Sequence, residues 1–153
     1  MFTRRTFLTA STAVVAILGS GRAMAFPVEL SEAEWREKLT PDQFLVLREG
    51  ATEEAFTSPL HEETREGTYH CVGCDHAIYS SADKFYSDSG WPAFTKGIEG
   101  GIETGPDPVY GALLTEVHCA NCGGHQGHIF NDGPEPLGER HCINGLSMTF
   151  IPA

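Results

Sequence analysis

Helical spacing of apolar residues is confined to residues 31–50, where two capping signals follow each other. Ser31-Glu32-Ala33-Glu34 has the form of a capping box, in which a serine and a glutamate three residues later cap each other's backbone amides. It predicts a short helix that ends at about Leu39. Thr40-Pro41-Asp42-Gln43 repeats the signal, with proline at the first helical position. The second helix should end near Gly50 and turn its apolar residues toward the core: Phe44, Leu45 and Leu47.

The chain after Gly50 predicts short strands joined by turns. Residues 51–66 are polar and irregular, with Pro59 as a breaker. Ala77-Ile78-Tyr79 has the composition of a short strand, and further apolar pieces stand at Val109–Leu114 and Ser147–Ile151 among glycine, proline, serine and aspartate. The pattern therefore favours a mainly β domain, a small antiparallel β fold with a short N-terminal helical pair.

Residues 1–25 differ from the remainder and have the features of an export signal. Arg4 and Arg5 form a twin-arginine pattern, an apolar run follows, and Ala23-Met24-Ala25 offers a cleavage site. We expect a twin-arginine (Tat) signal peptide, removed to leave a domain of residues 26–153 in the bacterial periplasm after passage through the Tat export machinery. The apolar run is too short for a stable membrane anchor. The alternative is a basic tail.

The charge of the chain argues against one class of partner. The 153 residues suit a single domain and carry a formal charge of −11. Cleavage after Ala25 would remove Arg4, Arg5 and Arg22, which leaves seven basic residues against 21 acidic ones and a charge of −14. Such an excess repels phosphate backbones and anionic lipids, so no nucleic-acid partner is expected.

Four of the five cysteines have the spacing of a metal site. Cys71 and Cys74 form one Cys-x-x-Cys pair, and Cys119 and Cys122 form a second pair, with 44 residues between the two. Each pair can turn two sulfurs toward one tetrahedral centre, and four thiolates suit a structural Zn²⁺ without an open position. Two disulfides are the main alternative in an exported protein, and a redox-active Cys-x-x-Cys is another. Export of an already folded protein would allow the metal to be loaded before oxidation competes for the thiols.

The fifth cysteine, Cys142, stands in a pattern that favours reactivity. Arg140, Cys142 and Asn144 alternate, so in a strand their side chains share one face. An arginine beside a thiol favours the nucleophilic thiolate. A buried, inert cysteine is the alternative.

Histidines and aromatic residues supply the other candidates for chemistry. His125 and His128 follow the second cysteine pair and, with the metal shell complete, are free for proton transfer near neutral pH. Asp132 can orient a histidine, pair with Arg140, or simply form an Asp-Gly turn. Trp91 and Phe94 could form an apolar wall for a small nonpolar group or pack in the core.

These motifs together resemble the methionine-R-sulfoxide reductase family, the B-type enzymes. The likeness covers about Ser31 to Pro152. It rests on Val46-Leu47-Arg48 with Gly50-x-Thr52-Glu53, Tyr69-x-Cys71-x-x-Cys74, Lys84-Phe85, Gly90-Trp91-Pro92-x-Phe94, Cys119-x-x-Cys122-Gly123, His125-x-Gly127-His128-x-Phe130, Asp132-Gly133-Pro134 and Arg140-x-Cys142-Ile143-Asn144.

The resemblance implies a fold of two antiparallel β-sheets (a β-tent) and the reduction of methionine-R-sulfoxide in proteins or peptides. By position, Cys142 is the nucleophile and becomes a sulfenic acid. The residues that help protonate the departing oxygen or support that step are His125, His128, Asp132, Arg140 and Asn144. Trp91 and Phe130 pack against the methyl group of the substrate.

Three positions depart from the family pattern. Many relatives carry a resolving cysteine where this chain has Ser89, so we expect an external thiol, a thioredoxin-like protein or a small molecule, to regenerate Cys142. His141 stands where tyrosine is usual, and Ala93 where serine is usual. The rival hypotheses are a zinc-stabilised binding or chaperone module, which needs no Cys142, and a thiol peroxidase or disulfide exchanger that uses it.

Overall fold

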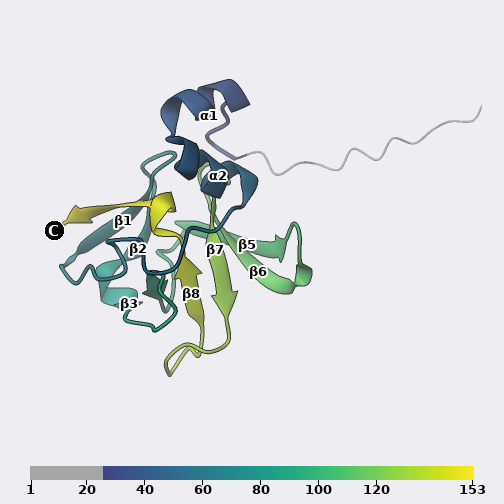
Figure 1. Cartoon of the computed structure of the whole chain (residues 1–153). Coiled ribbons are helices and arrows are strands. Elements are labelled where there is room, and N and C mark those ends of the chain that lie inside the picture. The colour runs from purple at the N-terminus through teal and green to yellow at the C-terminus, as the bar shows by residue number, and fades with distance from the viewer. Residues whose placement is uncertain (1–25) are drawn as a thin grey trace, which may run out of the picture.

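The computed structural model describes residues 26–153, so the predicted signal peptide lies outside the described residues. Two short helices, α1 (Glu32–Lys38) and α2 (Pro41–Glu49), precede nine strands (Figure 1). The strands are β1 (Gly67–Cys71), β2 (Ala77–Ser80), β3 (Lys84–Phe85), β4 (Ala93–Phe94), β5 (Ile102–Asp107), β6 (Gly111–Cys119), β7 (His125–Phe130), β8 (Arg140–Ile143) and β9 (Met148–Pro152). Two single 3₁₀ turns, Ser81–Asp83 and Gly145–Ser147, complete the described elements. None of the helices in this part of the chain has the length and apolar character to cross a membrane.

Both predicted capping boxes are present and set the start of each helix. The side chains of Ser31 and Glu34 cap α1 reciprocally, and those of Thr40 and Gln43 do the same for α2. Gly50 ends α2 in the left-handed conformation, with φ of 70°. The predicted buried face of α2 was wrong at one residue. Leu45 is exposed, and the buried face of α2 consists of Phe44, Val46 and Leu47.

The strands form two antiparallel sheets, which confirms the predicted fold class. The smaller sheet has the order β2-β1-β9, and the larger has the order β3-β4-β8-β7-β6-β5. In the smaller sheet, the register pairs Cys71 with Met148, so β1 meets the C-terminal strand β9. The two sheets splay apart in Figure 1, with α1 and α2 above them.

Aromatic side chains fill the space between the two sheets. Tyr69 of β1, Tyr79 of β2 and Phe94 of β4 are fully buried. Phe94 stacks on Tyr79 with ring centroids 4.3 Å apart and meets Tyr69 edge-on at 4.9 Å. Phe94 is therefore part of the core, which decides between the two roles that the sequence left open for it.

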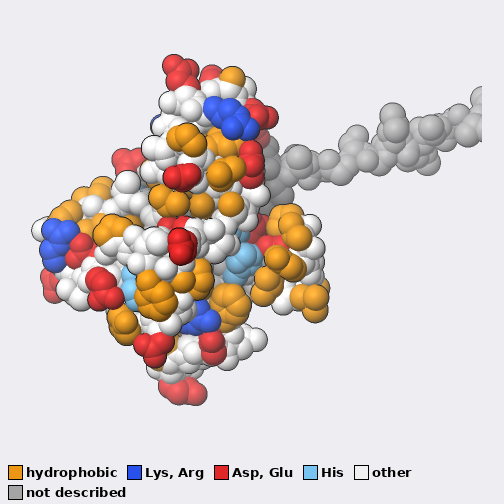
Figure 2. All heavy atoms as spheres, viewed as in Figure 1, with side chains coloured by type: hydrophobic (Ala, Val, Ile, Leu, Met, Phe, Trp, Pro, Cys, Tyr) orange, Lys and Arg blue, Asp and Glu red, His pale blue; other side chains and the backbone are white. Residues whose placement is uncertain are grey.

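The sequence suggested a strand at Val109–Leu114, but the structure divides this apolar piece between a turn and β6. Val109 and Tyr110 lie in the turn between β5 and β6, where both backbone amides donate to the carboxylate of Asp107 at 2.7 Å. Val109, Tyr110 and Leu113 are exposed, and Figure 2 shows apolar side chains gathered on this hairpin. The hairpin thus projects an apolar tip instead of supplying a core strand.

Candidate active site

The four paired cysteines converge on one point between the two sheets. Their sulfur atoms all lie within 4.8 Å of one another, with 3.7 Å between Cys71 and Cys122 and 3.6 Å between Cys74 and Cys119. A disulfide needs about 2.05 Å, so these thiols are free. A tetrahedral centre with metal–sulfur bonds of about 2.3 Å places its ligands roughly 3.8 Å apart, so the cluster fits a metal ion.

The two Cys-x-x-Cys turns repeat one backbone geometry. The amide of Asp75 donates to the carbonyl of Cys71 at 2.8 Å, and the amide of Gly123 donates to that of Cys119 at 2.9 Å. Asp75 and Gly123 both have positive φ, 58° and 66°. Because Cys71 ends β1 and Cys119 ends β6, the cluster joins the smaller sheet to the larger one.

Strand β8 presents Cys142 on the face opposite the core. Arg140 and Cys142 are half-buried, whereas His141 and Ile143 are buried, so the predicted alternation is confirmed for these four residues. The register places Cys142 opposite His128 of β7 and opposite Ala93 of β4. Directly paired residues of antiparallel strands share a face, so the thiol and the His128 imidazole are neighbours.

His128 belongs to a row of paired residues that crosses the larger sheet. Its partner on the other side is Glu116 of β6, so Cys142, His128 and Glu116 are consecutive in the row. Gly127, next to His128, pairs with Ile143, and a side chain there would clash with the Cys142 carbonyl oxygen. Glycine is therefore required for the close approach of β7 and β8 beside the thiol.

Each histidine is held by a carboxylate that the sequence did not single out. His125 Nδ1 lies 2.7 Å from Glu116 Oε1, and His128 Nε2 lies 2.7 Å from Asp107 Oδ2. Burial opposes ionisation of Asp107, but hydrogen bonds from His128 and from two backbone amides lower its pKa to about 2. The remaining nitrogen of His125, Nε2, is buried without a protein partner in residues 26–153. The imidazole rings of the two histidines are 5.2 Å apart.

Asp132 pairs with Arg140 and with neither histidine. The guanidinium of Arg140 donates two hydrogen bonds of 2.9 Å to the Asp132 carboxylate and lies over the ring of Phe130, 4.6 Å from its centroid. This pair orients Arg140 beside Cys142, which resolves the alternatives for Asp132 in favour of the arginine.

Burial and the neighbouring polar groups have opposite effects on the Cys142 thiol. Burial raises the pKa of its thiol above the ordinary value, and the opposing effects of Ser89 and Arg140 are smaller. The Ser89 hydroxyl lies 3.8 Å from the Cys142 sulfur and 2.6 Å from the Ser87 hydroxyl. Arg140 thus favours the thiolate in the predicted direction, because its guanidinium lowers the pKa of Cys142, but burial is the larger effect.

The sequence predicted that Asn144 shares the face of Cys142. This prediction was wrong, because β8 ends at Ile143. Its buried side chain accepts a hydrogen bond from the Glu53 amide and donates one to the Gln126 carbonyl, both at 3.0 Å. The Glu53 carboxylate in turn accepts from the amides of Gly145 and Leu146, at 2.6 and 2.8 Å. Asn144 and Glu53 therefore fix the backbone at the end of β8.

Trp91 stays near the surface, beside the site. Its indole nitrogen donates to the Glu53 carbonyl at 3.2 Å, and its backbone amide lies 3.4 Å from the Ser89 hydroxyl. Its indole is only partly buried, so it can still contact a ligand at Cys142. His141, in contrast, faces the core and hydrogen-bonds the Tyr79 hydroxyl at 3.0 Å, away from the thiol.

Comparisons with known proteins identify the family to which the chain belongs. The SelR domain family matches residues 39–152. A peptide methionine sulfoxide reductase MsrB of Agrobacterium fabrum is 47% identical over 126 residues, covering 82% of this chain and 93% of that protein. One of Methylibium petroleiphilum is 48% identical over 126 residues, covering 82% and 91%. The mitochondrial methionine-R-sulfoxide reductase B2 of Rattus norvegicus is 41% identical over 148 residues, covering 88% and 85%. The chain belongs to the methionine-R-sulfoxide reductase B family and has its peptide methionine sulfoxide reductase activity.

Proposed function

We propose that the protein reduces the R epimer of methionine sulfoxide in proteins and peptides through Cys142. The observation that carries this proposal is the row in which the thiol stands next to His128, itself held by Asp107 at 2.7 Å. A nucleophile and a proton donor are thus neighbours on one open face of the sheet.

In the first step the Cys142 thiolate attacks the sulfoxide sulfur. The sulfur–oxygen bond of the substrate breaks as the oxygen is protonated, and the oxygen ends on Cys142 as a sulfenic acid. Methionine leaves as a thioether, so its sulfur gains the two electrons that the Cys142 sulfur loses.

Proton delivery falls to His128 and His125, because each ring keeps one nitrogen that its carboxylate does not hold. Asp107 and Glu116 fix the two rings, Arg140 with its partner Asp132 stabilises the thiolate as it forms, and Asn144 positions the end of β8. Trp91 and Phe130 offer the apolar contacts for the methyl group.

Regeneration requires an external thiol. The other cysteines form the metal cluster, and Ser89 stands beside Cys142 in place of a resolving cysteine. The first external thiol condenses with the sulfenic acid to give a mixed disulfide and water, and a second thiol then releases Cys142. A thioredoxin-like protein or a small thiol supplies both electrons.

We further propose that the metal is Zn²⁺, held by Cys71, Cys74, Cys119 and Cys122. Four thiolates in a closed tetrahedron suit zinc and leave no position for water. Its contribution is structural, because it fixes the second Cys-x-x-Cys turn from which His125 follows.

The site of action proposed for this enzyme is the bacterial periplasm, where it would repair oxidised exported proteins. Support comes from the twin arginines at positions 4 and 5 and from the Ala23-Met24-Ala25 cleavage pattern. Mass spectrometry of the protein from its host should find a mature chain that begins at Phe26. A full-length periplasmic chain would contradict cleavage.

The deciding experiment is a stereochemical assay with dithiothreitol as reductant. We expect the wild-type protein to consume the R sulfoxide of a methionyl peptide and to leave the S sulfoxide intact. Consumption of both epimers, or of neither, contradicts the proposal.

Cys142→Ser separates the enzyme from a zinc-stabilised binding module. The variant should lose all turnover while it retains its fold and metal. Unchanged turnover would assign the chemistry to another group and overturn the role of Cys142.

A further inference from the structure

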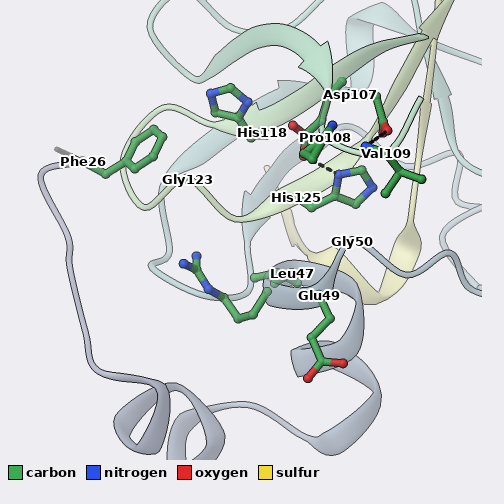
Figure 3. Close-up of a pocket in the computed structure, with 12 residues that line it drawn as sticks. Phe26, Leu47, Glu49, Gly50, Asp107, Pro108, Val109, His118, Gly123 and His125 are labelled. Atoms are coloured by element: carbon green, nitrogen blue, oxygen red, sulfur yellow. Dashed lines mark hydrogen bonds and ion pairs between the residues drawn. The ribbon is translucent and has the colours of Figure 1, made fainter. Parts of the chain in front are cut away.

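Two histidines in residues 26–153 are buried with a ring nitrogen that has no hydrogen-bond partner, His125 and His61. His125 lines a cavity of about 390 Å³ beside Asp107 and Val109 (Figure 3), and the proposed reaction already uses its ring for proton delivery. His61 is 3% exposed, and the proposed reaction gives it no role. A buried imidazole with an unpaired nitrogen costs stability relative to an apolar side chain, so the group that its other nitrogen binds is informative.

The one hydrogen bond of the His61 ring holds the loop that carries Trp91. Nδ1 lies 3.1 Å from the Trp91 carbonyl oxygen, which can only accept, so Nδ1 carries the hydrogen and donates it. Nε2 is the unpartnered atom, because Glu62 Oε1 lies 3.6 Å away, too far for a hydrogen bond. Among the described residues, the imidazole therefore hydrogen-bonds Trp91 alone.

The loop of residues 89–92 lies outside the strands and flanks the reacting thiol, since Ser89 Oγ is 3.8 Å from Cys142 Sγ. Residues 53–61 hold this loop through three hydrogen bonds. The Trp91 indole donates to the Glu53 carbonyl at 3.2 Å, and the Phe56 amide donates to the Gly90 carbonyl at 2.8 Å. Both of these bonds use backbone atoms of residues 53–61. The third bond, from His61, comes from a side chain, so a substitution can remove it without altering the backbone.

The backbone of His61 is fixed to the sheet that contains Cys142. Lys84 of β3 donates from its Nζ to the His61 carbonyl at 2.8 Å. Lys84 pairs with Phe94 of β4, and the neighbouring Ala93 pairs with Cys142 of β8. The imidazole thus connects the Trp91 loop to a part of the sheet whose position relative to the thiol is set by strand pairing.

Aromatic rings fix the orientation of the imidazole. Phe56 meets it edge-on, with ring centroids 5.7 Å apart, and the ring of Tyr86 lies 4.9 Å from it. Phe56 also packs on Gly90, where a Cβ would lie 2.8 Å from its ring. Its φ of 64° is uncommon for a bulky residue, and such conformations persist only where the surroundings determine them. His61 is therefore held with Nδ1 toward the Trp91 carbonyl.

We propose that His61 is a positioning residue of the reductase, whose Nδ1 holds the Trp91 carbonyl so that the indole meets the methyl group of the substrate. The inference rests on the reductase function proposed above and on the contact proposed there between Trp91 and the methyl group. An apolar residue at position 61 would fill the same buried space without an unpaired nitrogen, so stability alone does not favour histidine there.

The test measures a single turnover without reductant, on an acetylated, amidated peptide that contains one methionine-R-sulfoxide. In His61→Leu we expect the half-saturating peptide concentration to rise roughly three- to tenfold, the range that corresponds to one lost neutral hydrogen bond. The maximal rate should change by less than about twofold, because Cys142 and His128 remain paired across β8 and β7.

His61→Asn and His61→Gln form a matched pair. The amide nitrogen of asparagine takes the place of Nδ1 and should restore the wild-type half-saturating concentration. The amide nitrogen of glutamine takes the place of Nε2, so His61→Gln should behave like His61→Leu. Acrylamide quenching gives a second readout, because the chain has two tryptophans and Trp35 is only 3% exposed, which leaves Trp91 as the one that acrylamide reaches. Quenching should increase in the leucine and glutamine variants and stay at the wild-type value in the asparagine variant.

Trp91→Ala shows whether His61 acts through the indole. This variant should itself raise the half-saturating concentration, and His61→Leu added to it should change that concentration by less than about twofold, since there is no indole left to position. A three- to tenfold rise in the double variant, or no effect of Trp91→Ala alone, would overturn the inference.

Equal half-saturating concentrations in the asparagine, glutamine and leucine variants would also overturn the inference, as would a fall in the maximal rate alone. Each of these results leaves the reductase function intact, because the peptide is still reduced. Failure of the wild-type protein to reduce the peptide would instead refute the proposed function itself.

Discussion

The hydroxyl oxygen of Ser89 lies 3.8 Å from the sulfur of Cys142, with the Ser87 hydroxyl behind it at 2.6 Å. A sulfur atom in place of that oxygen would need to move by less than about 2 Å to reach the roughly 2.05 Å of a disulfide bond. The geometry for an internal resolving step is thus present, although the chain places no thiol there.

Ser89→Cys should therefore convert the enzyme to one that resolves its own sulfenic acid. After one equivalent of methionine-R-sulfoxide and no reductant, non-reducing peptide mapping should find a disulfide between position 89 and Cys142 in the variant only. Ser87→Cys is the control, because the Ser87 hydroxyl is hydrogen-bonded to Ser89 and, among the described residues, makes no hydrogen bond to Cys142. An internal disulfide in the wild-type protein would contradict the proposed need for an external thiol.

Burial raises the pKa of Cys142, and Arg140 and Ser89 oppose this effect. Removal of either group should raise the pKa further, because both stabilise the thiolate. We expect iodoacetamide to alkylate Cys142 in Arg140→Met several-fold more slowly at pH 7 than in the wild-type protein, with the midpoint of the pH profile displaced upward. Arg65→Met, at an exposed arginine paired with Glu63, should behave as wild type. A downward displacement of this midpoint in Arg140→Met would show that the arginine does not lower the pKa of Cys142.

Asp107 should contribute stability that depends on pH. Its pKa in the folded protein is about 2, below the ordinary value of 3.8, so its contribution is present above pH 4 and is lost as the pH falls toward 2. Asp107→Asn should lower the free energy of unfolding near neutral pH by on the order of 1 kcal/mol, and the difference from wild type should vanish near pH 2. Urea denaturation across this range measures it. The exposed Asp88→Asn is the control, and a difference independent of pH would argue against the ion pair.

Asp107→Asn should also slow turnover, because the carboxylate holds His128 at 2.7 Å. We expect kcat for a methionine-R-sulfoxide peptide to fall roughly 10- to 100-fold, the range typical of a lost orienting partner. KM should change much less if the Asp107 carboxylate acts only through its hydrogen bond to His128. An unchanged kcat would exclude the carboxylate as a positioning group.

Loss of a metal ligand should destabilise the domain, because the cysteine cluster joins the two sheets. Cys74→Ser takes one ligand from the cluster that joins β1 to β6, and we expect loss of bound zinc and a melting temperature lower by roughly 10 °C or more. Elemental analysis and calorimetry provide the two readouts. Cys142→Ser is the matched control, since it should keep one zinc per chain and the wild-type melting temperature while it loses activity. Equal metal content in the two variants would refute the assignment of Cys74.

Features set by local sequence were predictable. The capping boxes at Ser31 and Thr40 need only neighbouring residues, and both are present. The Cys-x-x-Cys spacing predicted the cluster, and strand alternation predicted the opposite faces of His141 and Cys142.

Features set by distant contacts were not predictable in the same way. Asp107 and Glu116 come from the β5–β6 hairpin, and only folding brings them to the histidines. The alternation of Glu116 with its apolar neighbour Val117 was the one available signal, because it places the carboxylate on the face away from the core. The raised pKa of Cys142 depends on burial, which a list of flanking residues does not contain.

The pairing of Cys71 with Met148 has a consequence for biosynthesis. The smaller sheet is β2-β1-β9, so β1 lacks its second neighbour until β9 has been translated. The sheet can close only after Pro152 has left the ribosome, and the cysteine cluster at its end cannot be fully enclosed earlier. Closure of this domain therefore follows synthesis of all its strands.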